Sequence, residues 1–382
     1  MSMETAFLGD IMIERQKSID PKKSPEANFA LYSIPGFDAG EPEICMGDAI
    51  GSTKKCLEPG DVVLSRIIPH IRRAWVVGDH DVDHIVGSSE WIVFRSPKFH
   101  GPYLRHIVTA DPFHAQFMNT VAGVGGSLVR ARPKAAAQIK IPLPPLEEQR
   151  RIAGILDAAD AQRRRRREAL ALLDTLPGAI FAEETEQADN WESVRFGDLV
   201  EIGSGNGFPI VEQGQVCGKY PFLKVGDMTL PGNEERLTNS RNWIDDDARS
   251  RLKAKVFREG AIVFPKIGAA IATNKKRVLA QDSCVDNNVM VATPKEGVSS
   301  RLILEVLRRK NLSEFASTSN PPSMRKGTVE EWELKFPKTG RRAAVEQKLF
   351  EIDAMGRNYR AQLSNMETLF ASLQSRAFAG EL

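Results

Sequence analysis

Two long stretches of the chain repeat apolar residues at the spacing of a helix that packs along its length. The later stretch places apolar or small residues at alternating steps of four and three, at Leu349, Ile352, Gly356, Tyr359, Leu363, Met366, Phe370, Leu373 and Ala377. The same steps, 197 residues earlier, give Ile152, Ile155, Ala159, Gln162, Arg166, Ala169, Leu173, Leu176 and Ile180. Such steps put side chains on one face of a helix. The pattern predicts two long helices, each with an apolar seam.

Each seam needs a partner, because an apolar stripe over about 30 helical residues, roughly 45 Å, is costly to leave in water. The nearest partner is the other helix, and a globular domain between the two lets the pair lie antiparallel as a coiled coil. We expect the helices to pack through Ile152, Ile155, Leu173, Leu176, Leu349, Ile352, Leu363, Phe370 and Leu373. The alternative is that each helix packs separately on its own domain. Pro177 should end or kink the earlier helix.

The residues before the first helix mix short apolar runs with turn signals. Residues 62–64, 75–77 and 91–94 have the composition of strands, and residues 103–108 and 113–121 that of short helices. A proline cluster at 142–145 then ends this pattern and prepares the start of the long helix, which carries acidic residues in its first turn. The pattern predicts a mixed α+β domain.

The same order of motifs then begins again. Residues 4–11 match 192–199, residues 60–67 match 260–267, and residues 139–142 match 334–337. An internal repeat of this kind defines the architecture before any motif is interpreted. We predict an α+β fold of two repeated mixed domains and two long helices: residues 1–144, first domain; 145–186, central helix; 187–340, second domain; 341–382, closing helix.

Composition changes this picture little. The net charge is only +2, so a nucleic-acid partner would have to be bound by local basic patches. The four cysteines form no CxxC pair, which disfavours a zinc module or a disulfide framework. No signal peptide is visible, and no apolar stretch approaches the roughly 18 residues of a membrane span. We expect a cytoplasmic, soluble protein.

Two motifs could indicate a methyltransferase. Residues 200–207 resemble the glycine-rich turn that binds S-adenosylmethionine, and residues 320–323 resemble the NPPY motif of enzymes that methylate amino groups in DNA. However, Pro209 and Gly214 follow the glycines, Ser323 replaces the aromatic residue, and the first copy has neither motif. We expect a flexible loop at 200–207 and no methyl transfer by this chain.

Two other candidate sites have simpler interpretations. Residues 333–335 have the E-x-K spacing of metal-dependent nucleases, but the first copy lacks the acid, so a strand leaving the domain is favoured. Residues 80–84, with two histidines and two aspartates, could bind a metal. A turn that enters the strand at 85–86 is the simpler interpretation, because strict alternation would separate the histidines from the aspartates. We expect no catalytic residues and no metal.

Basic and polar residues next to turns are better candidates for DNA contacts, because Arg and Lys bind phosphates while Arg, Asn and Gln read base edges. Arg66 matches Lys266, and Ser127 matches Ser323. The candidates are Arg66, His70, Arg72, Arg73, Ser127, Arg130, Arg132 and Lys134 in the first domain, and Lys266, Asn274, Lys275, Lys276, Arg277, Ser323, Arg325 and Lys326 in the second. Each could instead be plain solvated surface. The arginine run at 163–167 fits a phosphate contact, an acidic partner protein or a solvated face.

The whole chain resembles the specificity subunit of Type I restriction-modification systems. The residues that carry the resemblance are the segments 141–149 (IPLPPLEEQ) and 376–382 (RAFAGEL), together with the Gly-Asp pairs at 9–10 and 197–198. The first domain lacks the usual tryptophan, with Met3 where the second domain has Trp191.

This resemblance implies two target recognition domains that each read half of a split DNA site. The helices would then act as a ruler and as the docking surface for two modification subunits, which bind S-adenosylmethionine and methylate adenine. Two ATP-driven restriction subunits with a Mg-dependent nuclease would complete the assembly, and this chain would bind no cofactor and have no active site. The alternatives are a stand-alone S-adenosylmethionine-dependent DNA methyltransferase and a coiled-coil scaffold that binds DNA without sequence preference.

Overall fold

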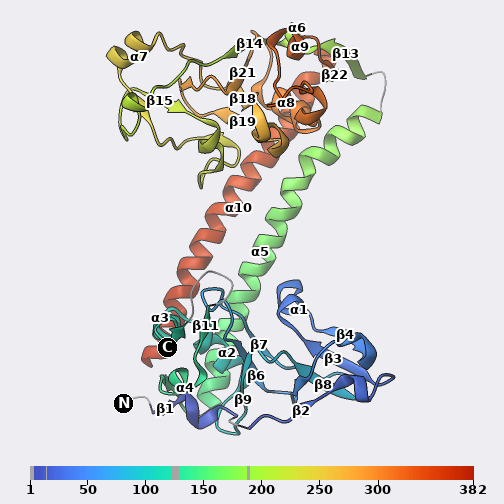
Figure 1. Ribbon diagram of the computed structural model, residues 1–382, viewed down its shortest axis with the longest axis vertical. Helices are drawn as coiled ribbons and strands as arrows, with labels where there is room; N and C mark the ends of the chain where they lie inside the picture. The colour runs from blue at the N-terminus through green and yellow to red at the C-terminus, as the bar shows by residue number, and fades with distance from the viewer. Residues whose placement is uncertain (1–3, 14, 123–128, 187–189) are drawn as a thin grey trace. The chain divides into compact units, whose positions relative to one another are not determined.

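A computed structural model of the protein describes residues 4–13, 15–122, 129–186 and 190–382 (Figure 1). The chain forms two compact units, one of Met1–Glu168 with Arg360–Leu382 and the other of Ala169–Tyr359. We call these unit 1 and unit 2. Each unit holds one of the repeated domains and a part of each long helix. The two units therefore do not coincide with the four segments predicted from sequence. Each unit contains residues of three of those segments: one domain and a part of each helix.

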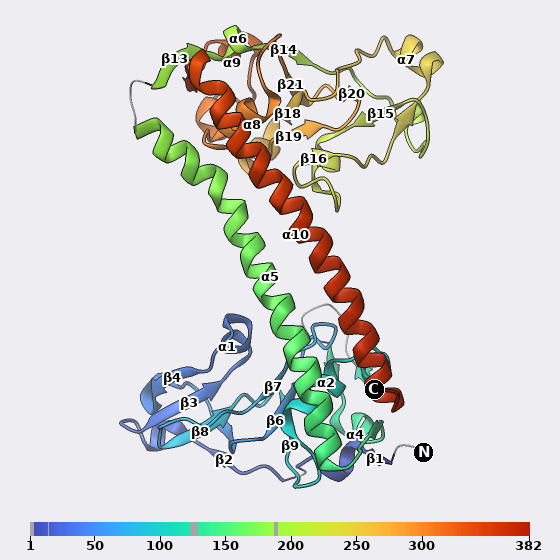
Figure 2. The ribbon, with the colours of Figure 1, turned by 180° about the vertical axis from the view of Figure 1, so that it is seen from behind.

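The two long helices are α5 (Leu146–Glu186) and α10 (Thr339–Ala379). In unit 1 the start of α5 lies along the end of α10, as Figure 2 shows. Arg151 donates to the carbonyl of Leu382, whereas Arg167, further along α5, pairs with Glu367. The partner number falls as the α5 number rises, so the helices are antiparallel there. The predicted fold class, two repeated α+β domains with a pair of packed long helices, is confirmed.

The helix α5 does not end at Pro177, contrary to the expectation from sequence. Pro177 lies inside the helix, and its side chain is buried. One turn later, Phe181 is 1% exposed and packs edge-on against Trp191, with ring centroids 5.4 Å apart. Arg309 lies over the Phe181 ring and donates to the Gly178 carbonyl. These contacts with the second domain hold the chain helical where proline removes one backbone hydrogen bond.

In unit 1, two sheets carry the first domain. Strand β6 is the centre of an antiparallel three-stranded sheet of order β7-β6-β9, with bounds Ala74–Val76, Val62–Ser65 and Trp91–Phe94. The five-stranded sheet has order β2-β5-β8-β3-β4, with bounds Ser18–Ile19, Lys54–Cys56, His84–Gly87, Asn28–Tyr32 and Glu43–Met46. Two ribbons, β1·β12 (Thr5–Phe7, Lys140–Pro142) and β10·β11 (Val121–Ala122, Arg130–Ala131), complete the strands. The helices are α1 (Ile34–Ala39), α2 (Gly101–Thr109), α3 (Asp111–Met118) and α4 (Pro133–Ala136).

In unit 2, the second domain repeats this plan with additions. The sheet around β18 has order β14-β21-β18-β19-β16, with bounds Val200–Ser204, Val289–Pro294, Ile262–Pro265, Arg277–Leu279 and Arg236–Leu237. The other sheet has order β17-β15-β20, with bounds Trp243–Ile244, Tyr220–Leu223 and Cys284–Val285. The ribbon β13·β22 joins Trp191–Arg195 to Glu333–Pro337. The helices are α6 (Phe196–Leu199), α7 (Asp246–Leu252), α8 (Ser300–Arg308) and α9 (Lys326–Glu330).

Most of the short elements expected from sequence are present. The strands expected at 62–64, 75–77 and 91–94 lie within or overlap β6, β7 and β9, and the expected helices overlap α2 and α3. The loop expected at 200–207 is wrong in its first part, because Val200–Ser204 is strand β14 and pairs with β21. Gly203 has a packing role in this strand. A Cβ at that position would clash with the ring of Phe257, so the glycine leaves room for this core side chain.

The backbone pairing of β12 and β22 corrects one match between the two copies. Residues 139–142 were aligned with 334–337, and this alignment is wrong by two residues. The amide of Leu8 donates to the carbonyl of Ile139, and in the second domain the amide of Phe196 donates to that of Trp332. Ile139 therefore corresponds to Trp332, not to Leu334. A shift by two residues keeps every side chain on the same face of a strand, so the apolar pattern cannot reveal it.

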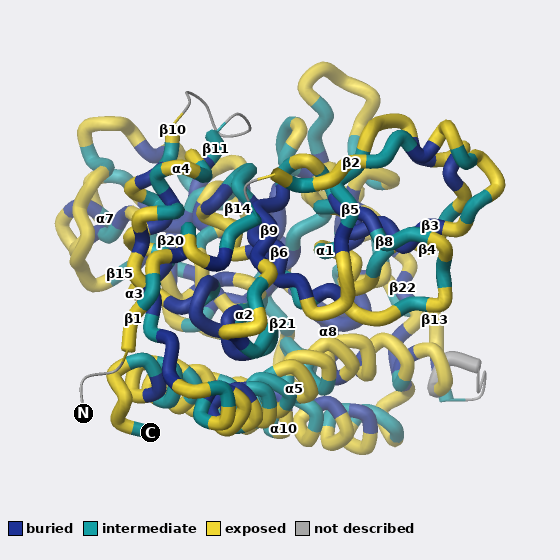
Figure 3. The backbone as a smooth tube through the Cα atoms, turned by 90° about the horizontal axis from the view of Figure 1, so that it is seen from below, coloured by how far each residue is buried: buried dark blue, intermediate teal, exposed yellow. Residues whose placement is uncertain are grey.

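Each domain is fixed to the long helix that follows it by its core and by an arginine–aspartate pair. In unit 1, Ile152, Ala153 and Leu156 of α5 join the core around β6 and α2. In unit 2, Val345 and Leu349 of α10 join the core around β18 and α8. Figure 3 shows that both long helices alternate buried, intermediate and exposed stretches along their length. The domains are thus built on their helices rather than linked to them flexibly.

The arginine–aspartate pairs occupy similar places in the two units. On α2, Arg105 binds Asp157 of α5 at 2.6 Å, and His106 Nε2 lies 2.8 Å from the same oxygen. On α8, Arg301 binds Asp353 of α10 through two bonds of 2.8 and 3.1 Å. Charge-assisted contacts of this kind fix orientation as well as distance. They orient each domain about its own helix.

Candidate DNA interface

Three chain segments meet beside the end of strand β6 in the first domain. The amide of Arg66 donates to the Glu90 carbonyl at 3.0 Å, and the amide of Ala131 donates to the Arg66 carbonyl at 2.8 Å. The amide of Ile68 donates to the Val129 carbonyl at 3.0 Å. These backbone bonds place the side chains of Arg66, Glu90 and Arg130 together.

The three side chains form a charged cluster that is open to solvent. Arg66 Nε lies 3.1 Å from Glu90 Oε2, and Arg130 binds both Glu90 oxygens at 3.2 to 3.3 Å. The side chains are 32%, 20% and 39% exposed for Arg66, Glu90 and Arg130. Burial alone would raise the pKa of Glu90, but Arg130 and Arg66 hold it below its ordinary value. Glu90 is therefore ionised at neutral pH and binds both arginines.

Lys55 adds a further cation to the edge of this cluster. Its ammonium donates to the Trp91 carbonyl at 2.6 Å. Burial lowers the pKa of Lys55, and the nearby charge of Arg66 lowers it further, while Glu90 acts in the opposite direction. With one carboxylate among three cations, the region keeps a net positive charge.

The second domain has the same backbone frame with different side chains. The amide of Lys266 donates to the Asn288 carbonyl at 3.0 Å, that of Met324 to the Lys266 carbonyl at 2.9 Å, and that of Gly268 to the Pro322 carbonyl at 2.8 Å. Lys266, Asn288 and Ser323 therefore stand where Arg66, Glu90 and Arg130 stand in the first domain. We call these three positions in each domain the readout frame.

The match of Arg66 with Lys266 agrees with this frame, but that of Ser127 with Ser323 does not. Bridges join Ile67 to Arg130 and Ile267 to Ser323, so the counterpart of Ser323 is Arg130. Ser127 itself lies outside the described residues. Sequence comparison missed the correct partner because arginine and serine share no chemistry.

Arg73 must be withdrawn from the candidates in the first domain. Its side chain is 8% exposed and binds both carboxylate oxygens of Asp38 at 2.7 and 2.8 Å, and this bond keeps the pKa of Asp38 below its ordinary value. A guanidinium fixed in this way has no free face for DNA. It was misassigned because the sequence shows charge but not burial.

The other candidates in the first domain lie at the surface. His70 and Lys134 are exposed. Arg72 pairs with Asp111 at 2.5 Å and donates to the Thr109 carbonyl, while Arg132 donates to the Thr120 carbonyl at 3.2 Å. His70, Arg132 and Lys134 remain accessible for phosphate contacts, whereas Arg72 would first have to leave its carboxylate.

Two of the second-domain candidates are also structural. Lys276 is 4% exposed, its ammonium donates to the Lys310 carbonyl and to Asn274 Oδ1, and burial lowers its pKa to about 8. Arg277 donates to the Asn233 carbonyl at 2.6 Å. Lys276 and Arg277 hold the loop between β18 and β19 against its neighbours, and we withdraw both from the DNA candidates.

The remaining second-domain candidates are more open. Asn274 has a left-handed backbone with φ of 53°, and its side chain accepts from the Leu312 amide, so its role is partly structural. Lys275 is half-buried, and Arg325 and Lys326 are exposed at the start of α9. Lys326 lies 3.6 Å from Glu330. The segment that follows Ser323 thus carries two exposed cations, Arg325 and Lys326.

The arginine run on α5 is neither a uniform patch nor a simple solvated face. Arg163 lies over the Phe370 ring of α10 at 4.1 Å and near Asp160 at 3.5 Å, and burial lowers its pKa. Arg167 pairs with Glu367 at 2.7 Å, while Arg164 and Arg165 are exposed. Part of the run therefore joins the two helices within unit 1.

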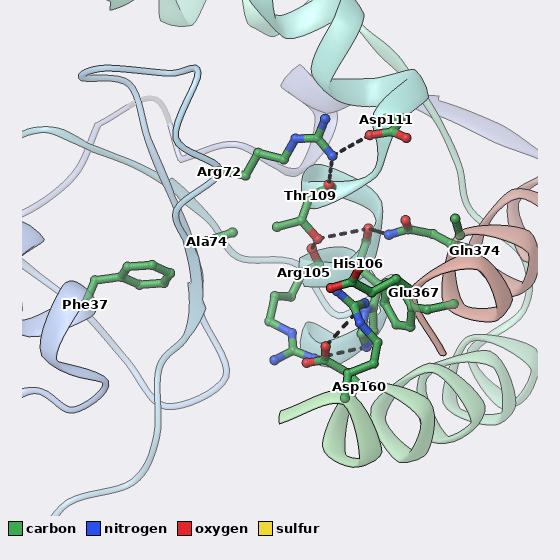
Figure 4. A pocket seen from close by; sticks show the side chains of 13 residues that line it. Phe37, Arg72, Ala74, Arg105, His106, Thr109, Asp111, Asp160, Glu367 and Gln374 are labelled. Atoms are coloured by element: carbon green, nitrogen blue, oxygen red, sulfur yellow. Dashed lines mark hydrogen bonds and ion pairs between the residues drawn. The ribbon is translucent and has the colours of Figure 1, made fainter. Parts of the chain in front are cut away.

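A polar cavity of about 390 Å³ lies beside this part of the helices (Figure 4). Arg72, Arg105 and Arg163 line it together with Asp111, Asp160 and Glu367. Cations and anions are equal in number, so the lining favours neither an anionic nor a cationic ligand. The cavity is best described as a polar junction of α2, α5 and α10.

The residues expected to pack between the helices differ in burial. Ile152, Leu173 and Leu349 are 1%, 6% and 0% exposed. Ile155, Ile352, Leu363, Phe370 and Leu373 are half-buried. Leu176 is 41% exposed, and the neighbouring Pro177 and Phe181 are buried instead. The expectation for Leu176 is wrong because an α-helix drifts from a strict seven-residue repeat.

The other candidate motifs lie in strands or in hydrogen-bonded turns. Glu333–Lys335 lies in strand β22, as expected. His80 Nε2 hydrogen-bonds the Tyr32 hydroxyl at 2.8 Å, and His84 begins strand β8. Among the described residues, no group of three or more His, Cys, Asp or Glu side chains could hold a metal ion. In the same part of the chain, no helix is long and apolar enough to cross a membrane.

Sequence reasoning missed Glu90, Asp157 and Asp353, the carboxylates that organise the arginines. A carboxylate among basic residues carries no recognisable motif, since its partner lies 24 residues or more away. The helix repeat gives no signal either, because the offset of 197 residues aligns Asp157 with Ala354 rather than with Asp353.

Comparison with known proteins gives consistent matches. The model of the family described as Type I restriction modification DNA specificity domain matches residues 3–170 and again residues 188–351. The Type I restriction enzyme MjaIX specificity subunit of Methanocaldococcus jannaschii is 22% identical over 176 residues, which is 41% of this chain and 40% of that protein. The chain therefore matches about two fifths of the length of this curated relative.

Two solved structures have a similar fold. One comes from work on complex assembly and conformational transition of the type I R-M system, with a TM-score of 0.62, 20% identity, and coverage of 99% of this chain and 98% of the other. The other is a Type-I restriction-modification system S subunit from M. genitalium, with a TM-score of 0.58, 10% identity, and coverage of 99% and 96%. At these identities the likeness concerns the fold alone.

Proposed function

Because this chain belongs to the Type I restriction modification DNA specificity domain family and carries two copies of that domain, we propose that it is the specificity subunit of a Type I restriction-modification complex. Each domain reads one half of a split DNA site. The observation that carries this proposal is the readout frame: two domains hold the same backbone arrangement at the end of β6 and β18 but present different side chains. Two domains that share a backbone arrangement but differ in their contact residues suit two half-sites of different sequence.

The long helices set the distance between the half-sites in this proposal. Both α5 and α10 begin in one unit and end in the other without interruption. A continuous helix of 41 residues is about 60 Å long, and it cannot be stretched without breaking backbone hydrogen bonds. The core contacts and the arginine–aspartate pairs at Asp157 and Asp353 fix each domain to the long helix that follows it.

The chain acts as a targeting subunit, and its partner subunits catalyse the methylation and the cleavage of DNA. Two modification subunits bind S-adenosylmethionine and methylate adenine, and restriction subunits use ATP and Mg²⁺ to translocate and cut DNA. The partners dock on the long helices, and the complex acts on double-stranded DNA in the cytoplasm. Phosphates in both half-sites are contacted by the remaining accessible candidates, His70, Arg132, Lys134, Lys275, Arg325 and Lys326.

Mapping methylated adenine across the genome tests this function directly. The map is compared between cells that carry the complete locus and cells from which only the gene of this chain has been deleted. We expect a split motif, with two short specified halves and an unspecified spacer, that disappears on deletion. If both maps are the same while the modification gene is expressed, the chain does not direct methylation and the proposal fails.

A further inference from the structure

The readout frame holds different chemistry in the two domains, and this difference is informative. Phosphates are the same in every half-site, so residues that bind them need not differ between the domains. Bases differ between half-sites, and so must the residues that read them. Lys266, Asn288 and Ser323 replace Arg66, Glu90 and Arg130 on an unchanged backbone. A change of side chains at matched backbone positions is what we expect of residues that contact bases.

In the first domain, one carboxylate binds two guanidinium groups and leaves part of each free. Glu90 accepts from Arg66 through Nε and from Arg130 through Nε and Nη2. Among the described residues, no acceptor meets the terminal amino groups of Arg66 or Nη1 of Arg130, and neither side chain is buried. The free donors are thus oriented and accessible.

A base edge suits this cluster better than a phosphate. A phosphate clamp gains from unpaired positive charge, and the Glu90 carboxylate would repel the phosphate. Base readout instead needs a guanidinium whose plane is fixed, because an arginine binds O6 and N7 of guanine through two parallel hydrogen bonds. Fixing the arginine before it meets DNA also reduces the entropy lost on binding.

Resting on the function proposed above, we propose that Arg66, Glu90 and Arg130 form the base-reading element of the first domain. Arg66 or Arg130 binds the major-groove edge of a guanine in the first half-site. Glu90 is a positioning residue, which orients the two guanidinium groups without touching the base. The same frame in the second domain reads a different base through Lys266, Asn288 and Ser323.

The test uses the full chain in cells that carry the complete restriction-modification locus, with methylated adenine mapped across the genome. Glu90→Gln keeps the size of the side chain and removes its charge. We expect the guanine preference at one position of the first half-site to fall by about tenfold, because an oriented arginine–guanine contact carries discrimination of that order. The second half-site and the spacer should be unchanged.

Three further variants separate positioning from folding. Glu58→Gln is the matched control, because it removes a carboxylate that pairs with Arg95 elsewhere in the same domain, and it should leave the motif intact. Glu90→Asp retains the carboxylate and should keep more of the guanine preference than Glu90→Gln. Arg130→Ser introduces the residue found in the second domain and should relax the same position of the motif.

Two outcomes would overturn the inference. One is a first half-site without guanine in the unaltered protein. The other is a uniform loss of methylation at all sites in Glu90→Gln with the motif unchanged, which would assign the arginines to phosphate or to folding. If the unaltered chain directs no split motif at all, it is the proposed function that fails, so the two failures are distinguishable.

Discussion

Two arginines in loops, Arg73 and Arg325, have the same charge but different surroundings. Arg73 is buried in a bidentate pair with Asp38, whereas Arg325 is exposed beside α9. Arg73→Ala should lower the free energy of unfolding by about 2 kcal/mol, because hydrogen bonds to charged groups contribute at that level. Arg325→Ala should leave stability unchanged. Denaturant unfolding of the two variants measures this difference.

For DNA affinity we expect the larger effect from Arg325→Ala and the smaller effect from Arg73→Ala. A lost phosphate contact reduces the slope of log affinity against log salt concentration by about one, whatever the sequence of the DNA. Arg325→Ala should show this reduced slope, and Arg73→Ala should retain the slope of the unaltered chain. An unchanged slope in Arg325→Ala would remove that residue from the phosphate contacts.

His106 makes the stability of unit 1 depend on pH. Burial, together with the charge of Arg105, lowers its pKa below the ordinary value, and Asp157 and Asp160 only partly oppose this. In the unfolded chain the histidine therefore takes up a proton at a higher pH than in the folded protein, so stability falls as pH decreases through about 6.5. The melting temperature should fall more between pH 7.5 and 5.5 than in His106→Gln.

The comparison with His106→Gln is needed because other groups act in the same direction. Burial also lowers the pKa of His100 and of His114, so the unaltered chain and the variant both lose stability in acid. Only the difference between them belongs to His106. Equal losses in both proteins would show that the buried imidazole does not contribute.

At the scale of single residues, the sequence showed which side chains are basic but not which of them are free to contact DNA. Arg66 and Arg130, both named as candidates, lie together in the structure, but Arg73, Lys276 and Arg277 have the same charge and hold loops in place. Burial and the position of a distant carboxylate decide between these roles, and neither can be read from neighbouring residues. The key acid, Glu90, was therefore missed.

At the scale of single elements, a charged pair between α8 and α10 helps to attach the second domain to its helix. Arg301 is 19% exposed and contacts Glu305 and Asp353, of which Glu305 is 4% exposed. Burial alone would lower the pKa of Arg301, but the bonds to Asp353 and Glu305 raise it above its ordinary value. The arginine is therefore held in its charged form by two carboxylates.

Removing this arginine should be costly. Arg301→Met removes the guanidinium that binds Asp353 and one of the two that bind the buried Glu305, which keeps Arg308. The loss of these charge-assisted hydrogen bonds should reduce the unfolding free energy of unit 2 by about 3 kcal/mol. Lys326→Met breaks an exposed pair with Glu330 and should change it by less than about 0.5 kcal/mol. Denaturant unfolding gives both values, and faster hydrogen exchange in α8 and α10 of Arg301→Met would locate the effect. Similar values for the two variants would contradict this account.

The long helices were predictable because their apolar pattern extends over many turns, so single errors average out. Local exceptions were not predictable. Pro177 lies inside α5 because Arg309 and the Phe181–Trp191 contact, both from the second domain, support the helix beyond it. Likewise, Val200–Ser204 pairs as a strand despite its glycine because β21 lies beside it. Contacts from distant parts of the chain overrode local propensity in both cases.

At the scale of the whole molecule, the ruler proposal makes a quantitative prediction. Four residues inserted at matched points in the middle of α5 and α10 add slightly more than one turn, or about 6 Å, to each helix. The spacer of the methylation motif should lengthen by about two base pairs, while both half-sites keep their sequences. Genome-wide mapping of methylated adenine would reveal the new spacing.

A second insertion serves as the control. Two residues in each helix rotate the apolar seams by about 200° and separate the packed faces, so methylation should be lost rather than shifted. If the four-residue insertion changed the sequence of a half-site, the helices would be involved in readout and not only in spacing.

The composition of the two units also determines when each can be completed during protein synthesis. Unit 2 is one continuous segment, Ala169–Tyr359, whereas unit 1 requires Arg360–Leu382, which follow the whole of unit 2 in the sequence. Phe370, Leu373 and Phe378 pack on the core of the first domain, and Arg151 binds the carbonyl of Leu382. The domain that is translated first must therefore wait, with part of its apolar surface uncovered, until all of unit 2 has been synthesised.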